Sequence, residues 1–226
     1  MSIPDPVVLA LPFRGTWLVQ NSPARRVPSH GTDLFATTYA MDFVAVRGRR
    51  TATVRDWRTL LATEPPQRFL AFGRPVLAPA AGRVVTVHDG EVDHEARRSP
   101  TTLLAYALTQ AARVRRGAGA VAGNHVIVEL AGRQGYVLLA HLRAGSVRVA
   151  VGDPVDVGQE LGDCGNSGNS TQPHLHLQVM DAADPYAARG LPMAFRHYRS
   201  WRRAGDPPVE VDRGVPGEAA VVEPRR

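Results

Sequence analysis

Residues 173–179 read PHLHLQV, and this short stretch is the most informative part of the 226-residue chain. Side chains of a β-strand alternate between its two faces, so His174, His176 and Gln178 should share one face while the intervening apolar residues enter a core. Two imidazoles on one polar face could bind a metal ion or act in catalysis. Two partly exposed structural histidines would give the same pattern.

Further β-rich segments, separated by Gly and Pro, predict a mainly β protein with a mostly antiparallel core. They are residues 40–46, 75–88, 124–130, 135–142 and 175–180. One helix is expected over residues 100–116, because its apolar residues follow helical spacing and Gly117 closes it.

The chain length fits one domain. We expect an N-terminal segment at 1–27 and a β-sheet core at 28–200. Surface insertions interrupt the core at 47–73 and at 91–123. The Pro-, Gly- and Glu-rich end of the chain, 207–226, is predicted to be disordered.

Three more residues are candidates for a site. His141 ends an apolar strand, where an unpaired imidazole would be costly to bury, although a hydrogen-bonded core histidine fits as well. His30 lies in a turn-like loop, where a solvated histidine is the simpler interpretation. Asp42 lies inside an apolar strand, and a buried carboxylate usually has a cation or a hydrogen-bond donor beside it.

Several of these motifs together resemble a known family. The run GQELGDCGNSGNSTQPHLHLQV at 158–179, preceded by AHL and VGDPVDVGQ, resembles the C-terminal half of lysostaphin/LytM-type peptidases. Upstream, SHG, YAMDF and GRPVLAPAAGRVV resemble the first half in the same order. The resemblance implies an antiparallel β-sheet core of the lysostaphin/LytM type, duplicated hybrid motif-like, with one inserted helix.

The resemblance also implies a metal site and its neighbours. Zinc would be held by His30, Asp42 and His176, while His141 and His174 stay off the metal and serve the chemistry. The family's commonest arrangement is His-x-x-x-Asp, whereas the loop between His30 and Asp42 is longer. Branches with an elongated loop that ends in Tyr-Ala-x-Asp-Phe resemble this one, and Asp33 remains the rival ligand.

The implied function is that of a zinc metalloendopeptidase, a hydrolase that cleaves peptide bonds in bacterial peptidoglycan with a metal-activated water. The alternative is a non-enzymatic peptidoglycan-binding or hydrolase-activating module of the same fold, because some family members have lost metal ligands. A purely structural zinc site would not need two unligated imidazoles.

Charge and composition narrow the possible partners. All 27 basic residues are arginine and the net charge is +6, which can favour anionic partners. The arginines are scattered and no nucleic-acid motif accompanies them, so no nucleic-acid partner is expected. A peptide or peptidoglycan substrate is expected instead. The oligomeric state is left open.

The single cysteine, Cys164, cannot form an intrachain disulfide. Its glycine-rich flank offers no helix N-terminus to activate a thiolate, so we do not expect a cysteine nucleophile. The start of the chain shows no signal peptide and no segment is apolar enough to span a membrane. A cytoplasmic protein is therefore predicted, or an extracytoplasmic one if an unseen signal exports it. The remaining histidines are interpreted as surface or structural residues: His88, His94, His125 and His197.

Overall fold

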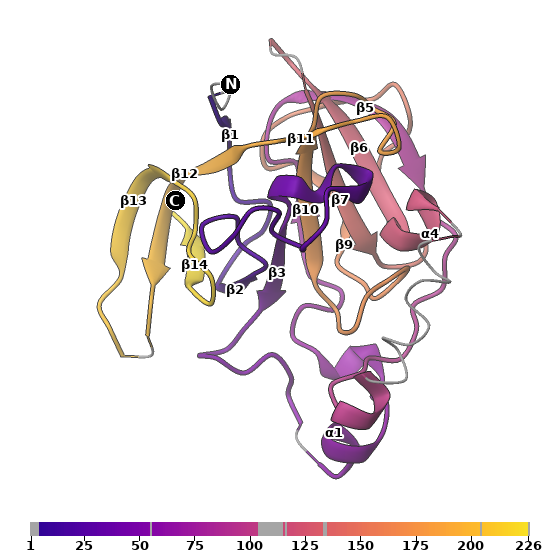
Figure 1. Ribbon diagram of the computed structural model, residues 1–226, viewed down its shortest axis with the longest axis vertical. Helices are drawn as coiled ribbons and strands as arrows, with labels where there is room; N and C mark the ends of the chain where they lie inside the picture. The colour runs from indigo at the N-terminus through magenta and orange to yellow at the C-terminus, as the bar shows by residue number, and fades with distance from the viewer. Residues whose placement is uncertain are drawn as a thin grey trace.

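A large β-sheet organises the computed structural model, which describes residues 5–54, 56–103, 115, 117–132, 135–203 and 205–225 (Figure 1). The strands are β1 (Val7–Leu9), β2 (Trp17–Gln20), β3 (Met41–Ala45), β4 (Pro75–Leu77), β5 (Gly82–His88), β6 (Asn124–Leu130), β7 (Tyr136–Leu142), β8 (Pro154–Val155), β9 (Glu160–Asp163), β10 (Leu175–Met180), β11 (Gly190–Leu191), β12 (Met193–Trp201), β13 (Val209–Gly214) and β14 (Val221–Pro224). The helical segments are η1 (Leu34–Tyr39), α1 (Arg58–Leu61), η2 (Pro66–Arg68) and α4 (Ala118–Ala122).

Within the described residues, the strand order of the large sheet is β1-β12-β14-β2-β3-β10-β7-β6-β5-β8. Strands β11 and β13 pair with β10 and β12, and β4 pairs with β9 in a separate two-stranded sheet. The pair β1–β12 is parallel, whereas the others are antiparallel. The predicted mainly β fold and its five strand segments are confirmed.

Strand β10 lies inside the sheet, between β3 and β7. Its residues Leu175, Leu177 and Val179 are at most 1% exposed and belong to the main hydrophobic core. Phe43 of β3 and Trp17 of β2 pack in the same core. These three apolar residues of β10 therefore share one face, as the alternation predicts, and the opposite face carries His176 and Gln178 and ends at Met180, which packs in a second, smaller cluster.

The two insertions contact each other, and α1 marks them at the bottom of Figure 1. Glu64 and Ala96 exchange two backbone hydrogen bonds of 2.9 and 2.8 Å. The buried Glu64 carboxylate also accepts two hydrogen bonds of 2.8 Å from Arg98. Phe69 packs with Ala52 and Ala96 in a small core of their own. The described parts of the two insertions thus pack against each other.

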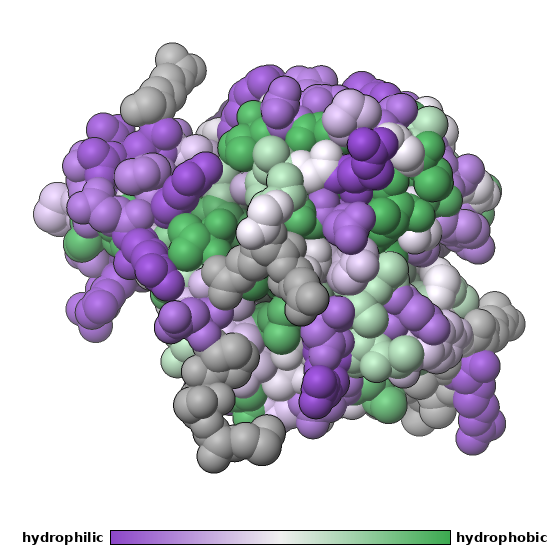
Figure 2. All heavy atoms as spheres, turned by 90° about the horizontal axis from the view of Figure 1, so that it is seen from above, coloured by the Kyte–Doolittle hydropathy of each residue, from purple (hydrophilic) through white to green (hydrophobic). Residues whose placement is uncertain are grey.

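The prediction of a disordered end at 207–226 is wrong. Strand β13 pairs with β12, and β14 lies between β12 and β2 in the large sheet. Val222 of β14 is fully buried, because its side chain joins the main core. Figure 2 shows a mostly hydrophilic surface on the side occupied by β12, β13 and β14. The polar residues that suggested disorder lie mainly in β13, which is largely exposed and is held by its pairing with β12.

The expected helix at 100–116 lies largely outside the described residues. Residues 100–103 are helical, and Ser99 Oγ accepts a hydrogen bond from the Thr102 amide at 3.2 Å, as an N-cap does. Every helix in the described part of the chain is too short or too polar to cross a membrane.

Candidate metal centre

Cross-strand pairing places a carboxylate beside an imidazole. Asp42 of β3 lies directly opposite His176 of β10 in the antiparallel ladder. Directly opposed residues point to the same face of a sheet. Asp42 Oδ1 therefore lies 2.9 Å from His176 Nδ1, and the two residues are only 6% and 9% exposed.

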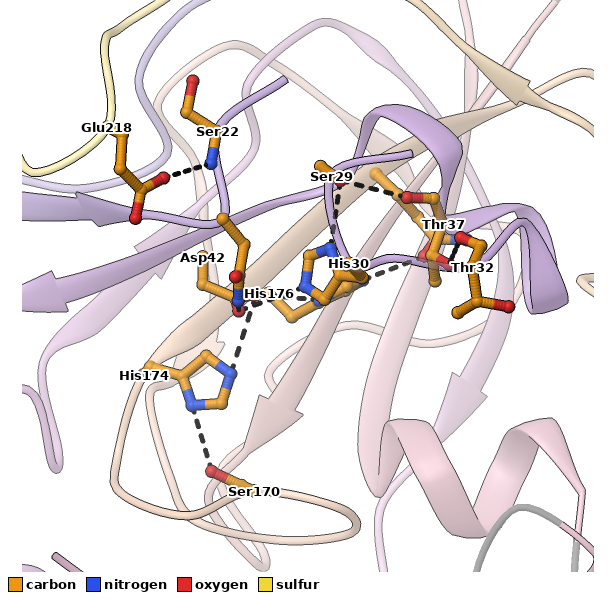
Figure 3. Close-up of polar contacts among 12 residues, drawn as sticks. Ser22, Ser29, His30, Thr32, Thr37, Asp42, Ser170, His174, His176 and Glu218 are labelled. Atoms are coloured by element: carbon orange, nitrogen blue, oxygen red, sulfur yellow. Dashed lines mark hydrogen bonds and ion pairs between the residues drawn. The ribbon is translucent and has the colours of Figure 1, made fainter. Parts of the chain in front are cut away.

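His30 approaches the same carboxylate from the loop that precedes η1, and Figure 3 shows the three side chains together. Its Nε2 lies 3.1 Å from Asp42 Oδ2, and its Nδ1 lies 3.1 Å from Ser29 Oγ. The Ser29 hydroxyl donates to the Thr37 carbonyl at 3.2 Å, so it accepts from His30 Nδ1–H. This tautomer leaves a lone pair on Nε2, directed toward Asp42.

Gln178 orients His176 in a comparable way. The Gln178 amide NH₂ donates to the Phe35 carbonyl at 2.8 Å, which turns its Oε1 toward His176 Nε2 at 2.9 Å. Because Oε1 can only accept, Nε2 of His176 carries a proton. The other ring nitrogen, Nδ1, can then present a lone pair on the side of Asp42.

Three electron-pair donors consequently face one point. Potential ligand atoms of His30, Asp42 and His176 lie within 4.8 Å of one another, and they form the one such group of three found among the described residues. Lone pairs on the two imidazoles would repel the carboxylate unless a cation lay between them. Two imidazole nitrogens and a carboxylate oxygen suit a zinc ion with an open coordination position. The donor set therefore fits a metal ion.

The shifted pKa values of Asp42 and His176 agree with this geometry. Burial raises the pKa of the Asp42 carboxyl, but the charges of His30 and His174 and the hydrogen bond from His176 outweigh burial and hold that pKa well below its usual range. Burial acts to lower the pKa of His176, and the hydrogen bond and charge of Asp42 overcome this and raise it. Without a metal, a second proton on His176 bridges to Asp42, and a bound metal ion would replace that proton.

His141 reaches the polar face through an irregularity in β7. Asn124 pairs with Leu142 and His125 pairs with Ala140, so His141 is an extra residue in a β-bulge. Its φ of 62° lies in the left-handed region. The bulge places His141 on the same side as Ala140, where both line one cleft. The ring centroids of His141 and His174 are 4.6 Å apart.

Backbone carbonyls hold both of these imidazoles. The Nδ1 of His141 lies 3.0 Å from the Ser167 carbonyl, and the Nδ1 of His174 lies 2.8 Å from the Gln172 carbonyl. A carbonyl can only accept, so Nδ1 is the protonated nitrogen in each ring and Nε2 bears a lone pair. Nε2 of His174 lies 3.7 Å from Asp42 Oδ1, near the candidate metal site (Figure 3). Burial and neighbouring histidines lower the pKa of His141, and burial lowers the pKa of His174.

The glycine-rich loop at 165–171 depends on a close backbone contact. Gly123 and Gly168 face each other so closely that a Cβ on either would collide with the backbone of the other. This contact brings Ser167 against β6 and β7. Its hydroxyl donates to the Leu142 carbonyl at 2.8 Å and accepts from the Asn124 amide at 3.0 Å. The loop is thereby held against β6 and β7, which positions the Ser167 carbonyl for His141.

The five candidate residues lie in one cleft of about 850 Å³. Segment η1, helix α4 and the residues that follow β10 form its walls. Asp33 lies outside the group of potential ligands, and its carboxylate accepts a hydrogen bond from Thr38 Oγ1 at 2.8 Å. Cys164 is fully buried and burial raises its pKa, so it is no nucleophile.

Sequence reasoning missed several residues around this site. Asn21 donates to Asp42 Oδ2 at 2.7 Å. Gln178 was placed on the correct face by alternation, but without a role. His125 was interpreted as surface or structural, yet it is 8% exposed and lines the cleft. Its position one strand beyond His141 in the alternating segment NHVIVEL was the available signal.

The chain resembles several solved structures at low sequence identity. Similar solved structures include the lysostaphin catalytic domain of Staphylococcus simulans, at 21% identity over 67% of this chain and 74% of that chain, with a TM-score of 0.38. The catalytic domain of the prophage-encoded M23 protein EnpA of Enterococcus faecalis is 17% identical over 84% of this chain and 92% of that chain, with a TM-score of 0.40. A zinc-containing peptidase of Vibrio cholerae is 18% identical over 80% of this chain, with a TM-score of 0.38, and the match spans 38% of that protein. Among curated proteins, none matches the chain.

A sequence profile described as Peptidase family M23 matches residues 68–188, more than half of the chain. The match places the chain, whose own fold is mainly β, in a class of peptidases. The chain belongs to peptidase family M23, which confirms the resemblance to lysostaphin/LytM-type peptidases. The matched region contains His141, His174 and His176 and begins after His30 and Asp42.

Proposed function

We propose that the chain is a zinc metalloendopeptidase that hydrolyses peptide bonds of bacterial peptidoglycan. One observation carries the proposal: the donor atoms of His30, Asp42 and His176 converge within 4.8 Å, beside two further imidazoles in the same cleft. Membership in peptidase family M23 supports the reaction type.

His30 Nε2, His176 Nδ1 and a carboxylate oxygen of Asp42 would hold the metal. Zinc, when bound, would lower the pKa of a water ligand and polarise the scissile carbonyl of the substrate. The protein contributes the fixed directions of the three ligands, because the hydrogen bonds that His30 donates to Ser29 and His176 donates to Gln178 set the tautomers of the imidazoles.

His141 and His174 would move the protons. Because burial lowers the pKa of each, both imidazoles are neutral near pH 7, and the lone pair on Nε2 can accept a proton from the attacking water. The protonated imidazole can then donate to the leaving amine, so the pair supplies both the base and the acid.

Metal analysis tests the ligands. Wild-type protein, purified without a metal-binding tag, should contain about one zinc ion per chain. Asp42→Asn should lose it, because the substitution removes a charged ligand from a buried site, whereas the matched variant Asp33→Asn should retain it. Zinc that remains in Asp42→Asn and disappears from Asp33→Asn would transfer the ligand role to Asp33.

Hydrolysis of purified peptidoglycan, followed by mass spectrometry of the released peptides, tests the reaction. His141→Ala should retain zinc and lose at least about 10²-fold of the activity, and the exposed control His197→Ala should retain both. Wild-type protein that binds zinc and peptidoglycan but releases no product would favour the non-enzymatic module. Peptidoglycan lies outside the cytoplasmic membrane, so the proposal also requires export, which cell fractionation measures.

A further inference from the structure

The glycine-rich loop at 165–171 consists of glycine and small polar residues. Its Ser167 carbonyl holds the imidazole of His141, so the path of the loop backbone decides how that imidazole is oriented. Glycine loses more conformational freedom on folding than any other residue, and a loop of this composition therefore needs contacts from other segments to keep one path. Segment 91–98, the first part of the second insertion, supplies such contacts.

His94 binds the loop at two points. Its backbone carbonyl accepts a hydrogen bond of 2.7 Å from the side chain of Asn166, which is fully buried. Its imidazole donates from Nε2 to the Gly168 carbonyl at 2.9 Å, because a carbonyl can only accept. Further along, the Arg97 amide donates to the Thr171 carbonyl at 2.6 Å. The insertion therefore contacts the loop along most of its length.

Asp93 joins the loop to the end of β7. One carboxylate oxygen accepts a hydrogen bond of 2.6 Å from the Asn166 amide, and the other accepts one of 3.1 Å from the Ala144 amide. The first amide lies one residue before Ser167, and the second lies three residues after His141. Asp93 thus ties together the two chain segments that carry this imidazole and the carbonyl that accepts its proton.

Gly165 makes room for the Asp93 carboxylate. A Cβ at position 165 would collide with that carboxylate and with the backbone of Arg143. The φ of Gly165 is outside the left-handed region, so close approach, rather than backbone conformation, requires a glycine here. The loop sequence is therefore fitted to the carboxylate of the insertion.

The insertion is itself fixed on both sides of these contacts. The side chain of Asn124, fully buried at the start of β6, accepts hydrogen bonds of 2.8 Å from the amides of Gly90 and Glu91. It also donates to the Glu91 carbonyl at 2.7 Å. At the other end, the buried Glu64 carboxylate binds the guanidinium of Arg98. Asp93 and His94 therefore lie on an anchored segment and can hold the loop in place.

We propose that Asp93 and His94 are positioning residues for His141. They keep the Ser167 carbonyl where it accepts the Nδ1 proton of His141, which leaves the lone pair on Nε2. The effect on the orientation of His141 follows from these contacts, whereas its consequence for hydrolysis rests on the proposed function. The second insertion thereby acts on the site through the glycine-rich loop.

Long-range ¹H–¹⁵N spectra of the histidine rings, recorded with and without added zinc, show which ring nitrogen carries the proton. Wild-type His141 should be protonated at Nδ1. In Asp93→Ala the loop loses its tie to β7, so His141 should also populate the tautomer protonated at Nε2. Asp89→Ala is the matched control, because Asp89 also accepts two backbone hydrogen bonds, of 2.7 and 3.1 Å, but from Gly145 and Val147. It should leave the His141 signals unchanged.

A second pair of variants covers the case in which Asp93→Ala does not fold. His94→Leu removes the donor to the Gly168 carbonyl and should change the His141 signals, whereas His94→Gln retains a side-chain N–H and should preserve them. Unchanged His141 signals in folded Asp93→Ala or in His94→Leu would overturn the proposal. An equal change in Asp89→Ala would overturn it as well, because the effect would then be a general loss of structure.

Hydrolysis of purified peptidoglycan measures the consequence for the reaction. Asp93→Ala should retain zinc and release peptides about 10- to 100-fold more slowly, because a small displacement of a catalytic group is costly, and Asp89→Ala should remain within about twofold of wild type. A wild-type rate in Asp93→Ala with altered His141 signals would refute the catalytic part of the proposal. Wild-type protein that binds zinc but releases no peptides would refute the proposed function, and the spectra would still decide whether Asp93 and His94 position His141.

Discussion

Replacement of Gln178 by leucine should weaken zinc binding without removing a ligand. In the native protein, the Gln178 Oε1 accepts the Nε2 proton of His176 at 2.9 Å and so leaves Nδ1 free for the metal. Leucine fills a comparable volume but offers no acceptor, so His176 can place its proton on either nitrogen. Loss of such an orienting hydrogen bond typically lowers metal affinity 10- to 100-fold. We expect that range here, which corresponds to about 1.4–2.8 kcal/mol.

The assay is a zinc titration against a chromophoric chelator of known affinity. Two variants separate the metal effect from a loss of stability, since Gln178→Leu also leaves the Phe35 carbonyl without its donor. Gln178→Glu keeps an acceptor for His176 and loses the same donor, so it should retain zinc affinity. Gln67→Leu, at an exposed position of η2, should behave as wild type. A zinc affinity of Gln178→Leu within about twofold of wild type would refute the assignment of the His176 tautomer.

Three further predictions concern the pair of strands at the C-terminus, the cysteine and the pH dependence of metal binding. Val222→Ala should lower the free energy of unfolding, measured by urea titration, by about 1–3 kcal/mol because Val222 is fully buried. The control Val209→Ala, at a 59% exposed site in β13, should change it by less than about 0.5 kcal/mol. Cys164 should resist alkylation in the folded protein and react after unfolding, because burial raises its thiol pKa; rapid alkylation of native protein would contradict its buried position. Zinc affinity should fall as the pH decreases through the pKa of His176, because protons compete with the metal below that pKa. Asp42 raises this pKa above its ordinary value. A zinc affinity that is the same at pH values above and below this pKa would exclude the competition.

Alternation of apolar residues was sufficient to locate the strands that build the site. In residues 175–179 the three apolar side chains are buried in the main core, and His176 and Gln178 lie on the opposite face, as a period of two requires. Asp42 was recognisable because a carboxylate inside an apolar strand needs a partner, and His176 lies directly across the ladder. These inferences succeeded because they use only the local geometry of a strand.

Inferences that depend on pairing between distant segments were less successful. In residues 136–142, strict alternation would direct His141 into the core with Val137 and Leu139. The bulge reverses this for one residue, and it arises from the mismatch between β6 and β7, which no local pattern in β7 reveals. Composition also misled at 207–226, because a polar strand that adds to an existing sheet needs few apolar residues of its own.

The orientation of the candidate site is set mainly by backbone carbonyls, and any residue can supply a carbonyl. Ser167 and Gln172 hold His141 and His174 in this way, and Phe35 acts on His176 through Gln178. The identities of these residues therefore say little about the site, since the path of the loop decides where each carbonyl points. What the sequence does encode are the two glycines that allow this backbone path. Gly168 has a φ of 68° and packs directly against Gly123. The glycine-rich loop is thus part of the machinery that sets the histidine tautomers, although none of its side chains needs to touch a metal.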